Sequence, residues 1–219
     1  MTFPIETEAT IKRRILEVCH SQARTIVDIV RELALMVDSV AERKERATKT
    51  HYEGMLKLIG ENDKLRTTLL EEVASVGSLL ISREDFLRLM FRMSAIADYA
   101  EALGFRLMGA ADRNWKLEKK HMQRLSEILA LVLSEITRMK ETLHSLSFDP
   151  EKAVELSRSV EELERKIDTD SRNLDFEILS GKLPVHEVFL LRDMADRAER
   201  IADLGVEVVD LIRVLALTG

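Results

Sequence analysis

Residues 188–212, VFLLRDMADRAERIADLGVEVVDLI, decide the fold because their apolar residues recur at alternating steps of three and four. Such spacing puts these residues on one stripe of an α-helix that packs against neighbouring helices. The middle of the stripe consists of Ala198, Ala202 and Gly205. Small residues let neighbouring backbones approach closely, so the stretch predicts a helix inside a bundle.

A second stretch repeats this pattern in the first half of the chain. Residues 92–98, RMSAIAD, precede residues 197–203, RAERIAD, by 105 positions. The same offset separates Asp63 from Asp168, so the match extends over two different helical segments. A shared register over two segments indicates the duplication of one structural unit.

This duplication predicts the organisation of the whole chain. We expect an all-α protein with two tandem three-helix-bundle repeats, residues 1–112 and 113–219, which together form one elongated six-helix molecule. The chain is 46% hydrophobic and 33% charged, with only 8 glycines and 3 prolines, as is typical of long amphipathic helices. Aromatic residues make up only 5% of the chain, which disfavours a sheet-rich fold.

Prolines and polar residues mark the expected helix starts. Proline is tolerated in the first turn of a helix, and Pro4, Pro150 and Pro184 all stand where a helix is expected to begin. Ser82 and Asp85 resemble a capping box. The expected helices cover residues 8–44, 47–80, 83–110, 115–147, 150–180 and 184–217.

Charge, cysteine content and hydropathy exclude several classes of protein. A net charge of −6 disfavours a broad nucleic-acid surface, so we expect no nucleic-acid partner. Cys19 is the only cysteine, so an intramolecular disulfide is impossible, and we expect this residue to be buried. The N-terminal MTFPIETEAT lacks a signal-peptide pattern, and no apolar stretch reaches the ~18 residues of a membrane span. We therefore expect a cytoplasmic protein that is peripheral to a membrane only through a partner.

Acidic residues follow the apolar stripe on the last two expected helices. Glu164 and Asp168 lie four residues apart, and so do Glu199 and Asp203. Like charges at this spacing are mildly destabilising on one helix. Two such pairs on neighbouring antiparallel helices would form a carboxylate cluster that a hard cation relieves. The alternative is a solvated acidic face with no ligand.

The first half carries an eroded version of the same pattern. Ile59 and Ser94 replace the two glutamates, whereas Asp63 and Asp98 keep the two aspartates. We expect any metal site in the first half to be the weaker of the two.

These residues are also where the chain resembles the PhoU family of phosphate-transport regulators. The resemblance lies in GENDKLRTTLLEEV (60–73) and SREDFLRLMFRMSAIADYAE (82–101) of the first half, and in ADRAERIADL (195–204) of the second. It extends over nearly the whole chain and is strongest to the short branch that accompanies Pit-type inorganic phosphate transporters. The ligands that it implies for a metal ion are Glu164, Asp168, Glu199 and Asp203, with Asp63 and Asp98 as their first-half counterparts.

The resemblance further implies a regulator or accessory protein of inorganic phosphate transport that acts on a Pit-type or related transporter in the membrane. It implies a metal ion as cofactor, and Fe, Mg, Mn, Zn and Ca all stay open because carboxylate oxygens suit several cations. Assembly into a homo-oligomer stays open as well.

Two other functions compete with this one. Glu-x-x-His, a motif of di-iron carboxylate bundles, occurs at 17–20, 118–121 and 141–144. The last two share one expected helix and lie roughly 35 Å apart, so they cannot meet, and the first could join only one of them. The second alternative is a helical scaffold or adaptor without a metal or ligand site. No Gly-rich phosphate loop, Ser–His–Asp set or nucleophilic cysteine context is present, so we expect no enzymatic activity.

Overall fold

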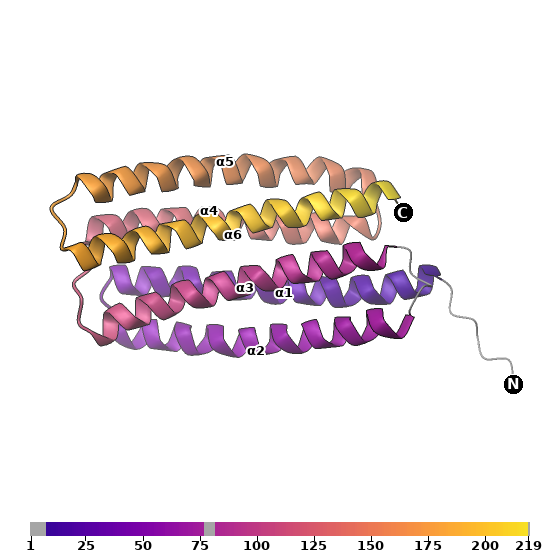
Figure 1. The fold of residues 1–219 in the computed structure, drawn as a ribbon, viewed down its shortest axis with the longest axis horizontal. Helices are drawn as coiled ribbons and strands as arrows, with labels where there is room; N and C mark the ends of the chain where they lie inside the picture. The colour runs from indigo at the N-terminus through magenta and orange to yellow at the C-terminus, as the bar shows by residue number, and fades with distance from the viewer. Residues whose placement is uncertain (1–7, 77–81, 219) are drawn as a thin grey trace, which may run out of the picture.

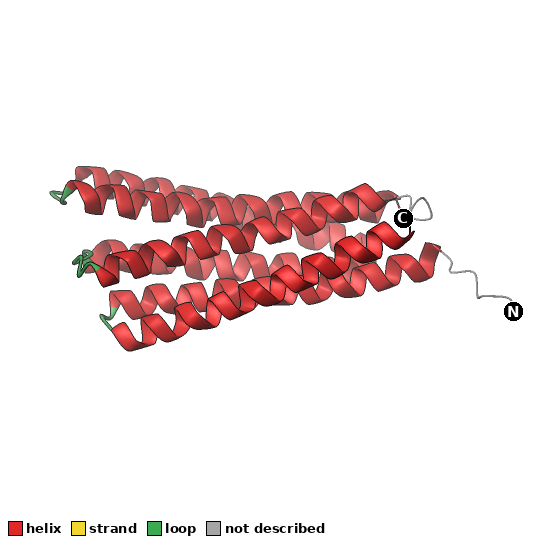
Figure 2. Cartoon of the chain, turned by 60° about the horizontal axis from the view of Figure 1, so that its bottom comes forward, coloured by secondary structure: helices red, strands yellow, loops and turns green. Residues whose placement is uncertain are grey.

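The fold consists of six long α-helices. The structure is a computed structural model that describes residues 8–76 and 82–218. The helices are α1 (Glu8–Ala41), α2 (Glu45–Val76), α3 (Arg83–Asp112), α4 (Lys119–Leu146), α5 (Pro150–Ser180) and α6 (Val185–Thr218). Within these described ranges there is no β-strand (Figure 2), which confirms the prediction of an all-α protein.

The helices run side by side along one long axis and form two three-helix bundles (Figure 1). The first bundle contains α1, α2 and α3, and the second contains α4, α5 and α6. The bundles contact each other through α1 with α4 and through α3 with α6, whereas α2 and α5 lie at the outer edges. The candidate ligands of the second half therefore lie on an outer helix, α5, and on a helix of the central layer, α6.

The helix boundaries repeat along the chain with the offset found in the sequence. α2 begins at Glu45 and α5 at Pro150, which lie 105 residues apart. α1 ends at Ala41 and α4 at Leu146, which are separated by the same 105 residues. These two boundaries keep the 105-residue offset, whereas the starts of α3 (Arg83) and α6 (Val185) lie 102 residues apart.

Two residues with left-handed backbone conformations lie near helix boundaries that differ from the expected ones. Arg43 (φ 58°) and Asn114 (φ 53°) have left-handed backbone conformations, which a right-handed helix cannot include. The first helix therefore stops at Ala41 rather than at residue 44. The prediction that the fourth helix begins at residue 115 is wrong, because a loop precedes Lys119.

Tertiary contacts stabilise this loop between α3 and α4. The Trp115 ring packs against His186, with ring centroids 4.5 Å apart. The Glu118 backbone N–H donates to Oε1 of Glu187 at 2.6 Å, so the first residues of α6 help to fix the start of α4. These contacts come from a distant part of the chain, and the local pattern does not contain them.

The expected helix starts differ in how they are made. Asp149 accepts a hydrogen bond from the Lys152 backbone N–H at 3.0 Å, and Pro150 opens α5, as predicted. Ser82 precedes α3, but its side chain makes no capping hydrogen bond, so the prediction of a capping box there is wrong. Pro4 and the expected end of the second helix at residue 80 lie outside the described residues.

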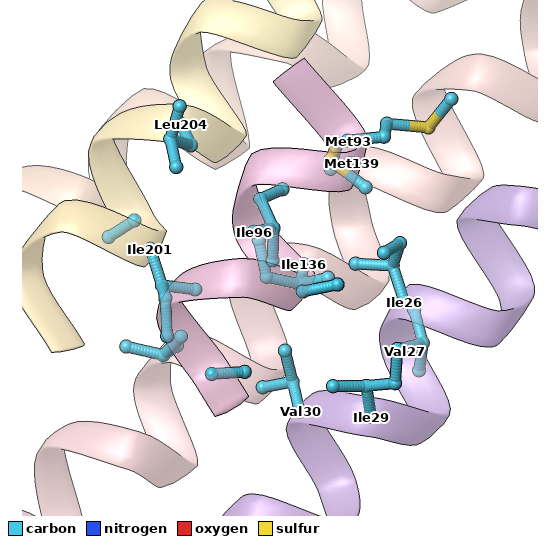
Figure 3. Packing of buried hydrophobic residues seen from close by; sticks show 14 of the residues in the cluster. Ile26, Val27, Ile29, Val30, Met93, Ile96, Ile136, Met139, Ile201 and Leu204 are labelled. Carbon is cyan, nitrogen blue, oxygen red and sulfur yellow. The ribbon is translucent and has the colours of Figure 1, made fainter. Parts of the chain in front are cut away.

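One continuous core joins the two bundles. Figure 3 shows Ile26 of α1, Ile96 of α3, Ile136 of α4 and Ile201 of α6 packed together, and all four are fully buried. The division into residues 1–112 and 113–219 as separate repeats stays a prediction, since the buried cluster extends through both. Cys19 is also fully buried, as expected, and burial raises the pKa of its thiol to about 12. Among the described helices, none has the length and apolar character needed to cross a membrane.

Candidate metal centre

The α5 and α6 helices bring the four predicted second-half ligands together. On each helix the stripe of apolar and small residues is buried, for example Ile167 on α5 and Ala202 on α6. The carboxylates lie next to this stripe and are partly buried, so they line the seam between the helices. The residues concerned are Glu164 and Asp168 of α5, and Glu199 and Asp203 of α6.

Ion pairs between α5 and α6 flank this group of carboxylates. Arg213 of α6 pairs with Glu161 of α5, and Arg192 of α6 pairs with Asp175 of α5. The four candidate ligands lie between these two arginine bridges along the helices. We call this stretch, with its four carboxylates, the acidic window.

Inside the acidic window, no arginine of the described chain forms an ion pair between the two helices. Asp168 pairs with Arg172 on its own helix at 2.8 Å, and Asp203 pairs with Arg200 on its own helix at 3.3 Å. Arg200 also pairs with Glu207 at 2.9 Å, so its charge is shared. Among the described residues, neither glutamate of the window has an ion pair or a hydrogen bond through its side chain.

The carboxylates of the window affect one another. Burial is the largest cause that raises the pKa of Glu164, and the charges of Asp168 and Asp203 raise it further. The pKa of Glu199 is raised by the same causes in the same order. Each glutamate therefore responds to an aspartate on the opposite helix. Arginines on the same helices neutralise part of this charge, and the two glutamates, which have no ion pair among the described residues, leave an excess of negative charge that attracts cations.

A fifth carboxyl, that of Glu135 on α4, lies inside the bundle within electrostatic reach of the window. Glu135 is fully buried, and neither of its side-chain oxygens has a hydrogen-bond partner. Its pKa is raised well above the usual value, first by burial and then by the charges of Glu164 and Asp203. The sequence analysis missed this residue.

A signal for Glu135 was present in the sequence. The buried residues of α4 include Val132, Ile136 and Met139, so Glu135 occupies a position within an apolar stripe. A charged residue at such a position is uncommon unless it has a partner. Only the three-dimensional packing shows that the carboxyl faces the acidic residues of α5 and α6.

The first half has a different arrangement around its two candidate aspartates. Asp63 and Asp98 are exposed, and Asp63 lies 3.8 Å from Arg66. The pKa of Asp98 is raised, chiefly by partial burial; the positive charge of Arg66 lowers it and the charge of Asp63 raises it further. The position equivalent to Arg66 in the second half is Ser171, and the aspartates there pair instead with Arg172 and Arg200 on their own helices.

Neutral groups fill the inner part of this first-half position. The Gln22 side chain donates to Oδ1 of Asn62 at 3.1 Å and to Oγ of Ser94 at 3.0 Å. Ile59, which replaces a glutamate, is nearly buried. The polar groups there have partners, unlike those of Glu135.

The acidic window has the donor chemistry of a metal site. Its oxygen donors suit hard cations, and the orphaned oxygens of Glu135 lie in the same region. In the described ranges, no group of three or more His, Cys, Asp or Glu side chains is already arranged to hold an ion. The carboxylates would therefore have to close around one, and the six predicted ligands stay predictions.

The Glu-x-x-His motifs are only partly brought together. The rings of His20 and His144 lie 5.3 Å apart between α1 and α4. Their glutamates pair with arginines on their own helices, Glu17 with Arg13 at 3.4 Å and Glu141 with Arg138 at 2.8 Å. A di-iron bundle combines such pairs with glutamates from two further helices, and no described group of this kind is present.

Comparison with known proteins identifies the fold. No family profile and no curated protein matches the sequence. A PhoU-like protein from Shewanella oneidensis MR-1 is similar in structure with a TM-score of 0.83 at 13% identity, over 94% of this chain and 100% of that one. A PhoU-like phosphate regulatory protein from the same organism matches with a TM-score of 0.80 at 14% identity, over 94% and 100% of the two chains. PhoU from Pseudomonas aeruginosa matches with a TM-score of 0.76 at 11% identity, over 95% and 98%. The chain therefore has the fold of the PhoU-like proteins over nearly its whole length.

Proposed function

We propose that this protein is a non-enzymatic regulator of inorganic phosphate transport. In this proposal it binds a metal ion through the acidic window and acts on a phosphate transporter in the membrane. The observation that carries the proposal is the match of the fold, from end to end, to a protein described as a PhoU-like phosphate regulatory protein. The acidic window supplies the site through which such a protein could respond to an ion.

The electrostatics of the window support a role for a cation. Uncompensated carboxylates in a partly buried site repel one another, and a cation between them turns this repulsion into attraction. The arginine bridges at both sides already hold α5 and α6 together. A bound ion would add a third connection between them at the middle of the bundle. Fe, Mg, Mn, Zn and Ca are all candidates, because the donors are carboxylate oxygens.

The proposed partner is a Pit-type or related inorganic phosphate transporter. The resemblance in residues 60–73, 82–101 and 195–204 supports this choice. In the proposal the protein reaches the membrane only through this partner. Among the described helices none could cross a membrane by itself.

A helical adaptor without a ligand is the second candidate function. The ion pairs that Asp168 and Asp203 make on their own helices favour it, because they neutralise part of the window without a metal. The absence of a ready-made group of three ligands among the described residues favours it as well. Removal of the carboxylates would leave the action of an adaptor unchanged.

Co-purification from native membranes tests the proposal and separates the two candidates. We define the fourfold variant as Glu164→Gln and Glu199→Gln with Asp168→Asn and Asp203→Asn. The matched control variant removes the same number of exposed charges elsewhere, by Glu151→Gln, Glu162→Gln, Asp112→Asn and Asp210→Asn. Each tagged protein is purified from cells grown with high or low phosphate.

The proposal predicts that a phosphate transporter co-purifies with the wild type and with the control variant. It predicts that the fourfold variant either recovers clearly less transporter or recovers an amount that no longer depends on the phosphate supply. Equal recovery with all three proteins would favour the adaptor. Absence of any phosphate transporter from the wild-type sample would contradict both the partner and the function.

A further inference from the structure

The buried carboxyl of Glu135 lacks any partner within the described structure. The residue is 0% exposed, and neither Oε1 nor Oε2 has a hydrogen-bond partner. Buried polar groups in folded proteins nearly always have partners, because an isolated group carries a desolvation penalty. The described chain itself supplies no group that satisfies this carboxyl.

The packing of α4 against α6 holds this carboxyl in place. A Cβ atom added to Gly205 of α6 would lie 2.6 Å from Oε1 of Glu135 and 3.1 Å from Cδ1 of Ile136. Glycine is thus the residue that leaves room for the carboxyl at this crossing. At this crossing the carboxyl is near enough to the acidic window for the charges of Glu164 and Asp203 to act on it.

The two halves of the chain differ in a matched way at this contact. With the offset of 105 residues, Val30 is the counterpart of Glu135, and Ala100 is the counterpart of Gly205. The first half therefore pairs a valine with an alanine, and both are fully buried. In the second half a larger, charged residue on α4 is combined with a smaller residue on α6.

The same contrast applies to the two glutamates of the window. Ile59 and Ser94 are the counterparts of Glu164 and Glu199. A glutamate is therefore present at the α4 position in the half that also has both window glutamates. In the half that lacks them, the equivalent position on α1 is occupied by Val30, which is apolar.

We infer that Glu135 is a further ligand of the proposed cation site, so that one ion would connect α4, α5 and α6. The carboxyl is buried, unpartnered and adjacent to the acidic window, and it is replaced by valine where the window glutamates are missing. The inference rests on the proposed function, because it assigns a residue to the same site. Electrostatics support it, since the charges of Glu164 and Asp203 act directly on Glu135.

A ligand from α4 would place the ion partly inside the bundle. The α5 and α6 carboxylates lie at the seam, where solvent reaches them, whereas Glu135 lies beneath them. A cation that binds Glu135 has to lose part of its hydration shell, and the added carboxylate compensates for this loss. Because α4 also contacts α1, an ion bound to Glu135 would also affect the packing of the first bundle.

Cation titration of two variants tests the inference. The first variant is Glu135→Gln, which keeps the shape and removes the charge. The second is the double variant Glu135→Val with Gly205→Ala, which copies the pair already packed in the first half. The control is Glu127→Gln, an exposed glutamate on the same helix. Each chelator-treated protein is titrated separately with Mn²⁺, Mg²⁺, Ca²⁺, Zn²⁺ and Fe²⁺. In the Mn²⁺ titration, the free ion is followed by electron paramagnetic resonance.

The expected result is cation binding by the wild type and the control with equal affinity. Both test variants should bind at least about tenfold more weakly, as is typical when an inner group of a metal site is removed. If Glu135→Gln fails to fold, the double variant decides, and circular dichroism checks its folding. Unchanged affinity of the folded test variants would overturn the role of Glu135 and leave the site on α5 and α6 standing. A wild type that binds none of the five cations would overturn the cation site itself, and with it this inference.

Discussion

At the scale of single residues, the acidic window should make stability depend on pH. The pKa values of Glu164 and Glu199 are raised in the folded protein by burial and by neighbouring carboxylates. The folded state therefore keeps protons that the unfolded state, with glutamate pKa values of about 4.3, has already released. The contribution of these groups to the free energy of unfolding is present below that pH and is lost as pH rises through the raised values.

The wild type and the fourfold variant should therefore differ in their free energy of unfolding by an amount that changes with pH. In the presence of chelator, the free energy of unfolding of the wild type minus that of the variant should fall from about pH 4 towards neutral pH. Groups with opposite behaviour, such as Asp193 with its lowered pKa, are present in both proteins and cancel in the difference. Urea denaturation at a series of pH values measures the difference in the free energy of unfolding. A difference that is constant or rises with pH would contradict the electrostatic account of the window.

The two halves of the chain should respond differently to metal. At a concentration 100 times its Kd, a ligand adds about 2.7 kcal/mol of stability, which raises Tm by roughly 5–10 °C in a chain of this size. The fourfold variant should lose this rise. The double variant Asp63→Asn with Asp98→Asn should keep most of it, because Ile59 and Ser94 leave the first half without the two glutamates.

Thermal unfolding with and without each cation measures this comparison. The matched control variant shows whether the loss of negative charge alone has an effect. A full rise in Tm for the fourfold variant would show that the assigned ligands are wrong. If the Asp63 and Asp98 variant loses more of the metal-induced rise in Tm than the fourfold variant does, the stronger site lies in the first half.

At the scale of helices, the two predicted caps should contribute differently to stability. Asp149 accepts a hydrogen bond from the Lys152 backbone at the start of α5, whereas the side chain of Ser82 makes none at the start of α3. Asp149→Ala should therefore destabilise the protein by about 1 kcal/mol, and Ser82→Ala by much less. Chemical denaturation of the two single variants measures both values. Equal losses would contradict the geometry of the two helix starts.

The sequence predicts helices well where local signals decide them. Asp149 and Pro150 mark the start of α5, and the helix ends at Ser180 as expected from the following glycine. The loop before α4 could not be predicted in this way, because residues 109–116 are largely polar and contain no clear stop signal. Its conformation depends on the contacts of Trp115 with His186 and of Glu118 with Glu187, about 70 residues further along the chain.

The candidate site shows the same limit. The carboxylates of α5 and α6 could be predicted because their spacing places each pair on one face of one helix. Glu135 could not be assigned in this way, since it lies on a third helix and its position relative to Asp203 is a matter of tertiary packing. The effect of Arg66 on Asp98 was missed for a related reason, because it acts between two helices.

At the scale of the whole molecule, the continuous core connects the proposed site to the rest of the structure. Residues of α1, α3, α4 and α6 pack into one another at the centre, as Figure 3 shows for Ile26, Ile96, Ile136 and Ile201. Further ion pairs join the bundles, including Arg106 with Asp193 at 3.0 Å and Arg92 with Glu207 at 2.8 Å. These contacts connect α6 directly to α3 of the first bundle.

Phosphate uptake in living cells tests the central claim most directly. Radiolabelled phosphate uptake is measured in cells whose own copy of the gene is deleted or replaced by the wild type, the fourfold variant or the matched control variant. We predict that deletion changes the rate of uptake, that the control variant restores it to the wild-type rate, and that the fourfold variant behaves like the deletion. Identical uptake in all four strains would contradict a role in phosphate transport, and full restoration by the fourfold variant would contradict regulation through the acidic window.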